Sequence, residues 1–483
     1  MSQNDICRMS AAALARLVRS RRLSPVEIID AVASRMARLE PALAAFCTPT
    51  LESARAEAGR IEASLAAGRP VGPLAGVPVG IKDLVLTRGV RTTFGSVAYR
   101  DFVPDEDDVV VERLKAADAI ILGKTNVPEL GYSAESGNLL FEPTRNPWRL
   151  DHAPGGSSAG SAVAVAAGMG PLAVGSDGGG SIRLPASFCG LYGFKPSMGR
   201  VPLYPGCRDE RYPGVSSWES LEHLGPLSRT VADSALMLSV IAGPDDRDRH
   251  SLPGTSDDWM GAPRGDVKGL RVAYSSDWGY AEVDPQVRAI VGNAVSVFER
   301  DLGCDVVEAH PSWEDPVPAF YALVALDTDL RGLRGLVARL GHKVSPRVRQ
   351  LAERGWTAEE FTDAVRARKA VYNAMWRFMR QYDLLLTPTV SLPPFPVPAP
   401  GASPAKASPI DPGRLVTFTC PFNLTGQPAA SVPAGWTDDG LPVGLQIVGR
   451  HLDDVTVLRA SAAYEAARPW HDRWPPMLEA AGP

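Results

Sequence analysis

The chain has 483 residues, of which 45% are hydrophobic and 22% are charged, an ordinary balance for a globular protein with a large core. Its 50 Lys and Arg residues against 55 Asp and Glu residues give a net charge of −5. This balance excludes a nucleic-acid-binding arm that works through bulk positive charge, and the hydrophobic content excludes disorder along the whole chain.

The first predicted element is one surface helix within residues 1–22, where Leu14 and Val18 alternate at helical spacing with Arg16. The segment lacks the continuous apolar core of a signal peptide. The longest apolar tract, residues 162–174, is interrupted by two glycines and a proline, whereas a membrane span needs about 18 uninterrupted apolar residues. We therefore expect neither export nor insertion into a membrane.

The six cysteines lie singly along the chain, without any C-x-x-C spacing. Isolated cysteines argue against a zinc knuckle, a dithiol redox pair and a disulfide scaffold. We therefore expect a reducing, cytoplasmic location. The cysteines are Cys7, Cys47, Cys189, Cys207, Cys304 and Cys420.

Helices and strands alternate along the rest of the chain. Ser24, Pro25 and Glu27 form a capping box that predicts a helix to about residue 39, and a second helix is expected over residues 51–65. Beyond residue 72, short β-branched runs alternate with helical patterns, which indicates an α/β fold. The expected strands are residues 77–81, 119–122, 171–174, 269–274 and 304–307, and the expected helices are residues 109–117 and 285–302.

Two stretches interrupt this alternation. Residues 243–266 are polar, and their length suits either a linker or a surface loop within one large domain. Residues 387–412 contain nine prolines, which predicts a rigid loop because neither a regular helix nor a central strand accommodates them.

Two clusters of glycine and serine, residues 155–161 and 175–183, could carry chemistry. The second cluster follows a predicted strand and contains three consecutive glycines, residues 178–180, with Ser181 directly after them. Backbone N–H groups without side-chain shielding are the donors from which oxyanion holes are built.

The first cluster fits more than one pattern. Residues 156–160 match the G-x-S-x-G nucleophile elbow with Ser158 as nucleophile, but that elbow needs a late histidine, and most later histidines lie in charged surroundings. The cluster also begins like a phosphate-binding loop, although Ser161 stands where the obligatory lysine should be. Neither pattern is favoured.

A serine can also be activated by a lysine that burial keeps neutral, directly or through a second serine. Only eight lysines occur in the chain, and two of them, Lys82 and Lys124, follow apolar runs at predicted strand ends. Burial at such a position lowers the pKa of an amine. Spacing alone does not choose between the two lysines.

Three motifs in order along the chain together resemble the amidase signature family. They are residues 80–83 (GIKD), 155–161 (GGSSAGS) and 175–186 (GSDGGGSIRLPA). The resemblance continues through residues 123–126, 193–197, 225–229 and 440–446, so it covers most of the chain.

The resemblance implies an α/β fold in which a large, mixed, twisted β-sheet is flanked by α-helices. It implies one domain over residues 1–483, made of an N-terminal helical part (1–70), a catalytic core (71–243) and a second half of the sheet that carries pocket loops (267–483). Homodimers occur in the family, so a homodimer is expected only by analogy.

Carried over by position, the resemblance implies that Ser181 is the nucleophile, that Ser157 bridges after a cis peptide bond, and that Lys82 is the base. No metal or cofactor is needed. The oxyanion hole would consist of the backbone N–H groups of Gly178, Gly179, Gly180 and Ser181. The supporting residues would be Asp177, Arg183 and Ser158.

The implied function is that of a stand-alone serine amidohydrolase with an acyl-enzyme on Ser181. Its substrates would be small aryl or alkyl amides, and carbamates (urethanes) or esters are admissible because they pass through the same tetrahedral oxyanion. No nucleic-acid partner is expected. The substrate pocket is expected to include Tyr132, Ser133, Trp218, Phe320 and Phe395.

The alternative is the A subunit of a glutamine-dependent tRNA amidotransferase. That subunit typically has Gln after Ser-Ile-Arg, whereas this chain has Leu184 there. This difference weakens the support for the alternative. A binding protein on an inactive hydrolase scaffold is disfavoured because Lys82, Ser157 and Ser181 are all present.

The chain departs from the family pattern at Gly178, where the family usually has Thr or Ile. We expect that loss of a β-branched side chain either opens room at the reacting carbon or loosens one donor of the oxyanion hole.

Overall fold

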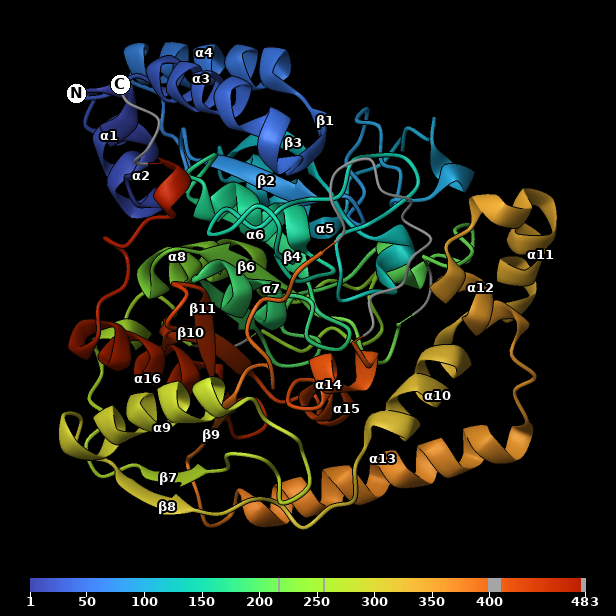
Figure 1. Cartoon of the computed structure of the whole chain (residues 1–483). Helices are drawn as coiled ribbons and strands as arrows, with labels where there is room; N and C mark the ends of the chain where they lie inside the picture. Colours follow the sequence, from blue (N-terminus) through green and yellow to red (C-terminus); the bar gives the residue numbers. More distant parts are fainter. Residues whose placement is uncertain (216–217, 255–256, 398–409, 479–483) are drawn as a thin grey trace.

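The structure is a computed structural model of the whole chain, and it describes residues 1–215, 218–254, 257–397 and 410–478. One 11-stranded sheet runs through the molecule, with helices packed on its faces (Figure 1). The predicted fold class, a large mixed sheet flanked by helices, is confirmed.

The strand order in the sheet is β1-β3-β2-β4-β6-β5-β10-β11-β9-β7-β8. Parallel pairs such as β2–β4 and antiparallel pairs such as β4–β6 occur side by side, so the sheet is mixed. Strands β1 to β6 meet strands β7 to β11 at the antiparallel β5–β10 pair. The strands are β1 (Phe46–Pro49), β2 (Pro78–Lys82), β3 (Ile120–Thr125), β4 (Leu172–Ser176), β5 (Tyr192–Lys195), β6 (Leu224–Ser228), β7 (Arg271–Tyr274), β8 (Asp305–Glu308), β9 (Leu384–Pro388), β10 (Ala429–Trp436) and β11 (Pro442–Gly449).

The α-helices are α1 (Gln3–Cys7), α2 (Ala11–Arg19), α3 (Pro25–Leu43), α4 (Leu51–Ala66), α5 (Val109–Ala116), α6 (Ala159–Ala166), α7 (Arg183–Cys189), α8 (Val231–Ile241), α9 (Pro285–Arg300), α10 (Val317–Asp327), α11 (Leu330–Leu340), α12 (Pro346–Glu353), α13 (Ala358–Phe378), α14 (Pro412–Val416), α15 (Pro421–Thr425) and α16 (Asp454–Ala467). Short 3₁₀ turns are η1 (Val97–Tyr99), η2 (Glu129–Gly131), η3 (Gly206–Arg208), η4 (Ala262–Arg264), η5 (Gly341–Lys343) and η6 (Pro476–Leu478). None of the helices in the described part of the chain is long and apolar enough to cross a membrane.

The single helix expected within residues 1–22 is wrong, because two helices, α1 and α2, occupy this segment. Ser10 lies between them and caps the second, since its hydroxyl accepts a hydrogen bond from the Ala13 amide. Leu14 and Val18 face the core, as their helical spacing predicted.

The other predicted elements correspond to observed ones within a few residues. The capping box of Ser24 and Glu27 forms and begins α3, and the predicted helices and strands match α4, α5, α9, β2, β3, β4, β7 and β8. The polar stretch 243–266 includes η4, which packs against α16; residues 255–256 lie outside the described part. In the proline-rich stretch, β9 extends to Pro388, and residues 398–409 lie outside the described part.

The central strands position the candidate site. Strands β2 and β4 are parallel neighbours and are buried along their whole length, so their carboxyl ends meet inside the protein. Lys82 is the last residue of β2, and Ser176 is the last residue of β4. Helix α6, which begins within the first glycine cluster, packs against both strands. The two clusters and one of the two candidate lysines therefore converge at one edge of the sheet.

Asp233 of α8 ties the N-terminal helices to the core. Its buried carboxyl accepts hydrogen bonds from the amides of Ala11 and Ala12, both at 3.0 Å, in the first turn of α2. These amides have no partner within their own helix, so we predict that Asp233→Ala destabilises the protein by about 2 kcal/mol. The measurement is the Tm of thermal unfolding of Asp233→Ala. The control is Glu299→Ala, which removes an exposed carboxyl on α9. Equal Tm values for the two variants would contradict the prediction.

Candidate active site

Lys82 lies at the centre of the candidate site. Its side chain is fully buried, and its Nζ lies 2.8 Å from Ser157 Oγ and 2.8 Å from Ser176 Oγ. A third contact of Nζ, at 3.2 Å, is with the carbonyl oxygen of Ser176. The structure therefore brings together one lysine and one serine from the two separate motifs that the sequence analysis singled out.

The environment of Lys82 favours its neutral form. Burial lowers the pKa of Lys82 from 10.5 to about 8, against the opposing charges of Glu222 and Asp177. A substantial fraction of neutral amine is then present at mildly alkaline pH, so Lys82 can accept a proton from the hydroxyl of Ser157.

Lys124 has a different place. It is also buried, and burial lowers its pKa to about 8, but its Nζ donates to the carbonyl oxygen of Val85 and to the hydroxyls of Thr87 and Thr92, both at 3.2 Å. These partners belong to the loop after β2. Lys124 therefore fixes this loop, whereas Lys82 contacts Ser157.

Ser157 follows a cis peptide bond, Gly156–Ser157, as the resemblance implied. Its neighbour Ser158 is fully buried, and its hydroxyl is tied to β4, donating to Ser176 O at 3.1 Å and accepting from Ser176 N at 3.2 Å. The hydroxyl of Ser158 therefore supports the loop and does not serve as the exposed nucleophile of a G-x-S-x-G elbow.

Ser181 is partly exposed, unlike the buried Gly180 and Ile182 beside it. Its hydroxyl makes no hydrogen bond with any residue in the described ranges, and its carbonyl oxygen accepts from the Ser158 amide at 3.2 Å. Ser181 thus has a free hydroxyl on a loop that is tied to the Ser157–Ser158 segment.

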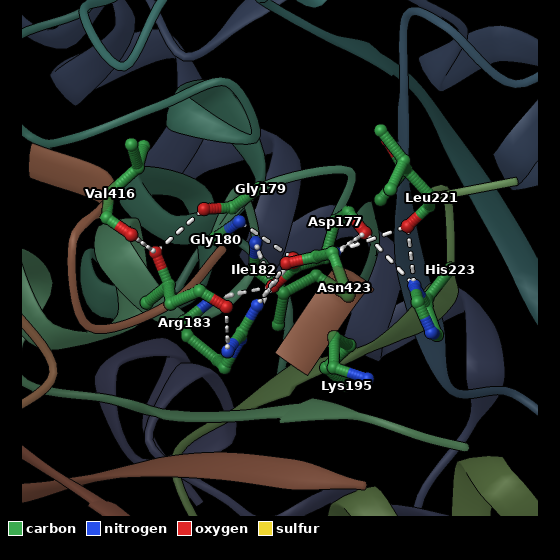
Figure 2. Close-up of polar contacts among 12 residues, drawn as sticks. Asp177, Gly179, Gly180, Ile182, Arg183, Lys195, Leu221, His223, Val416 and Asn423 are labelled. Atoms are coloured by element: carbon green, nitrogen blue, oxygen red, sulfur yellow. Dashed lines mark hydrogen bonds and ion pairs between the residues drawn. The ribbon is translucent and has the colours of Figure 1, made fainter. Parts of the chain in front are cut away.

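A buried ion pair holds the glycine loop, which comprises residues 177–183 (Figure 2). Asp177 and Arg183 are both fully buried, and the carboxylate accepts from Arg183 Nε at 2.9 Å and from Arg183 Nη2 at 2.8 Å. Burial by itself raises the pKa of Asp177, but the charge and hydrogen bonds of Arg183 hold this pKa well below its usual range.

Residues from the second half of the chain complete this network (Figure 2). Asn423 donates to the Asp177 carboxylate at 2.9 Å, and Arg183 Nη1 donates to Thr419 O at 3.0 Å and to Gln446 Oε1 at 2.7 Å. The glycine loop is therefore fixed from both halves of the sheet.

The loop leaves three of its four candidate amides available. The Gly180 amide donates to the Asp177 carboxylate at 2.7 Å, so it is already engaged. The amides of Gly178, Gly179 and Ser181 donate to no acceptor among the described residues. The expected four-donor oxyanion hole is thus a three-donor candidate in this structure.

Each glycine of the loop is crowded. A Cβ on Gly179 would lie 2.5 Å from Phe320 Cζ, and a Cβ on Gly180, which has a φ of +130°, would lie 2.3 Å from Thr419 Oγ1. Real Cβ atoms do not approach so closely, so a side chain at position 179 would displace the Phe320 ring, and one at position 180 would also be strained by the positive φ.

Gly178 makes space for two side chains. A Cβ at this position would lie 2.5 Å from Glu222 Oε2 and 2.7 Å from Trp218 Cε3. The expectation that Gly178 opens room at the reacting carbon is therefore wrong, because Glu222 and Trp218 fill that space.

Aromatic side chains cover the loop. The rings of Tyr132 and Trp218 lie 4.9 Å apart, and those of Trp218 and Phe320 lie 6.3 Å apart. Tyr132 and Trp218 also line a cavity of about 600 Å³, but Ser181 does not, so Trp218 stands between this cavity and Gly178.

Two other predicted pocket residues have different surroundings. Phe395 packs edge-on against Phe188 in a separate hydrophobic cluster, and it is only 8% exposed. The Ser133 hydroxyl accepts from the Glu135 amide at 3.1 Å, within its own loop. Neither residue lines the 600 Å³ cavity, and their roles stay predictions.

Sequence reasoning missed several residues of the site. Ser176 stood inside a recognised motif, directly before Asp177, and Gln446 stood at the end of another. Glu222, Thr419 and Asn423 carried no local signal, because only folding brings them to the glycine loop.

Comparisons with known proteins agree with this geometry. The family described as Amidase matches residues 27–458. The chain is 39% identical to an acylamidase of Rhodococcus erythropolis, over 98% of each protein. It is 36% identical to the A subunit of a glutamyl-tRNA(Gln) amidotransferase from Roseiflexus sp. strain RS-1, over 94% of this chain and 95% of that one.

Among solved structures, the chain is similar to a bacterial aryl acylamidase that belongs to the amidase signature enzymes. The TM-score is 0.88 and the identity is 32%, over 98% of this chain and 99% of that one. With the matching family, fold and relatives, the chain belongs to the amidase signature family and is a hydrolase that acts on amide C–N bonds.

Proposed function

We propose that the protein is a stand-alone serine amidase that forms an acyl-enzyme on Ser181, with Ser157 and Lys82 as its proton relay. The observation that carries this proposal is the 2.8 Å contact between Lys82 Nζ and Ser157 Oγ at a buried lysine of lowered pKa. Ser181 supplies the free, partly exposed hydroxyl on the adjacent loop.

The mechanism that we propose runs in two proton transfers and one attack. Neutral Lys82 takes the proton of Ser157, Ser157 takes that of Ser181, and Ser181 Oγ attacks the carbonyl carbon of the amide. The amides of Gly178, Gly179 and Ser181 stabilise the oxyanion. The relay returns the proton to the leaving nitrogen, and water then repeats the cycle on the acyl-enzyme.

The substrate we propose is a small aryl or alkyl amide. The acylamidase and aryl acylamidase relatives support this class, and so does the aromatic lining beside the loop. Carbamates and esters remain chemically admissible, because their hydrolysis passes through the same oxyanion. The cytoplasmic location and a homodimer remain predictions.

The amidotransferase A subunit is a second candidate, favoured by the 36% identity to such a protein over most of the chain. The residue at position 184 argues against this candidate, because it is Leu in this chain and typically Gln in the amidotransferase component. Leu184 is buried in an apolar cluster with Phe188 and Phe395, and its Cδ2 lies against Gly155. A component of this kind would need partner proteins for its function, whereas a stand-alone amidase would not.

The first prediction from this proposal concerns Ser181. Purified protein alone is expected to release nitroaniline from a small nitroanilide, and Ser181→Ala is expected to lower kcat by about 10⁴-fold because the acyl-enzyme cannot form. The control is Ser296→Ala, which removes a hydroxyl on α9 that lies outside both the relay and the predicted pocket. A kcat in Ser181→Ala close to that of the wild type would contradict the proposal, and ammonia release from glutamine only with added partner proteins would favour the second candidate.

The second prediction concerns pH. Because the relay needs neutral Lys82, kcat/KM is expected to rise with pH and to level off above an apparent pKa of about 8. Lys82→Ala is expected to lower kcat by about 10³-fold and to abolish this rise of kcat/KM with pH. A wild-type profile that is flat between pH 6 and 9 would be incompatible with Lys82 as the base.

The third prediction concerns Gly178. Gly178→Thr would push its side chain into Glu222 and Trp218, so we expect kcat/KM to fall by about tenfold on small and bulky anilides alike. Gly292→Thr, at a helical position with open space, is the matched control. Unchanged kinetics in Gly178→Thr would show that the crowding is harmless.

A further inference from the structure

Glu222 is a buried carboxyl beside the site that the relay described above does not use. It is 8% exposed and lies two residues before β6, and its Oε2 occupies the space that a side chain at position 178 would take. A buried carboxyl is costly unless a partner compensates it, so its position next to the glycine loop requires an explanation.

Ser176 contacts Lys82 and is a neighbour of Glu222. Its hydroxyl lies 2.8 Å from Lys82 Nζ, it lines the same small cavity as Glu222, and it lowers the pKa of the Glu222 carboxyl. Since Lys82 Nζ lies 2.8 Å from Ser157 Oγ as well, hydrogen bonds join Ser157, Lys82 and Ser176, and Glu222 lies beside Ser176.

The charges that face Glu222 come from several elements. Lys82 lies on β2, Asp177 follows β4, and Arg208 lies in η3. Asp108, directly before α5, lines a small cavity of about 30 Å³ together with Glu222 and Ser176. Burial raises the pKa of Glu222 to about 7, although Lys82 opposes this rise. Lys82 and Glu222 therefore influence each other's charge.

Building on the proposed function, we propose that Glu222 is a positioning residue of the relay that acts through Ser176 to orient Lys82 and to stabilise its ammonium form. It takes the part that the aspartate has in a Ser-His-Asp triad, with a hydroxyl in between. When Ser181 attacks, one proton moves from Ser181 to Ser157 and one from Ser157 to Lys82. The new ammonium charge on Lys82 then faces the Glu222 carboxylate. This charge disappears when the proton returns to the leaving nitrogen.

Gly178 is part of this arrangement. Because a Cβ there would lie 2.5 Å from Glu222 Oε2, a β-branched residue and the observed position of Glu222 exclude each other. The departure from the family pattern at position 178 thus makes room for the carboxyl.

The test is the pH profile of kcat/KM in Glu222→Gln, which removes the charge and keeps the shape. A carboxylate favours the ammonium form of a nearby lysine, so its removal lowers the pKa of Lys82 and moves the rise of kcat/KM to lower pH. We expect a shift of about one unit and a fall of about tenfold in the alkaline plateau of kcat. Glu210→Gln, which removes an exposed carboxyl in the preceding loop, should leave both unchanged.

The link through Ser176 is tested in the Ser176→Ala background, where Glu222→Gln should cause a clearly smaller shift. If Glu222→Gln shifts the rise of kcat/KM equally in both backgrounds, Glu222 does not act through Ser176. If the rise of kcat/KM stays at the same pH in Glu222→Gln, Glu222 does not have the proposed role. If Glu222→Gln does not fold, as thermal unfolding would reveal, Glu222→Asp provides the same test, with an intermediate shift expected and no shift contradicting the role. A kcat in Ser181→Ala close to that of the wild type would instead refute the proposed function itself.

Discussion

The buried ion pair between Asp177 and Arg183 is the interaction on which the site depends. Both side chains are fully buried, and two charges in such surroundings are tolerated only when each is paired and hydrogen-bonded. Asp177 meets this demand by accepting from the Arg183 guanidinium, the Gly180 amide and Asn423. A segment with three consecutive glycines would otherwise have many conformations, and the ion pair selects the one that presents Ser181.

The same pair joins the two halves of the sheet. Arg183 begins α7 in the first half, yet its guanidinium donates to Thr419 and Gln446 of the second half. Since Gln446 lies on β11, the orientation of the candidate nucleophile is coupled to strands that follow it by more than 200 residues in the sequence. This explains physically why the motifs of such a protein extend over most of its chain.

Two carboxyls beside the loop have opposite properties. Arg183 neutralises Asp177, whose lowered pKa keeps it charged, whereas Glu222 has a raised pKa and faces a lysine whose own pKa is lowered. The carboxyl of Asp177 has a structural role, because its charge does not change over the working range of pH. In our proposal the second serves proton transfer, since its charge and that of Lys82 depend on each other.

The sequence by itself determined the α/β class, several of the helices and strands, and the motifs with Lys82, Ser157 and Ser181, because hydrophobic periodicity, caps and glycine clusters are local signals. It did not choose between Lys82 and Lys124 from spacing alone, since both stand at strand ends and both are buried. Only the tertiary structure decided that Lys82 meets Ser157, that Asp177 occupies the Gly180 amide, and that Glu222 fills the space at Gly178. These contacts join segments that are distant in sequence or depend on the exact path of the loop, so their geometry exists only once the sheet has brought those segments together.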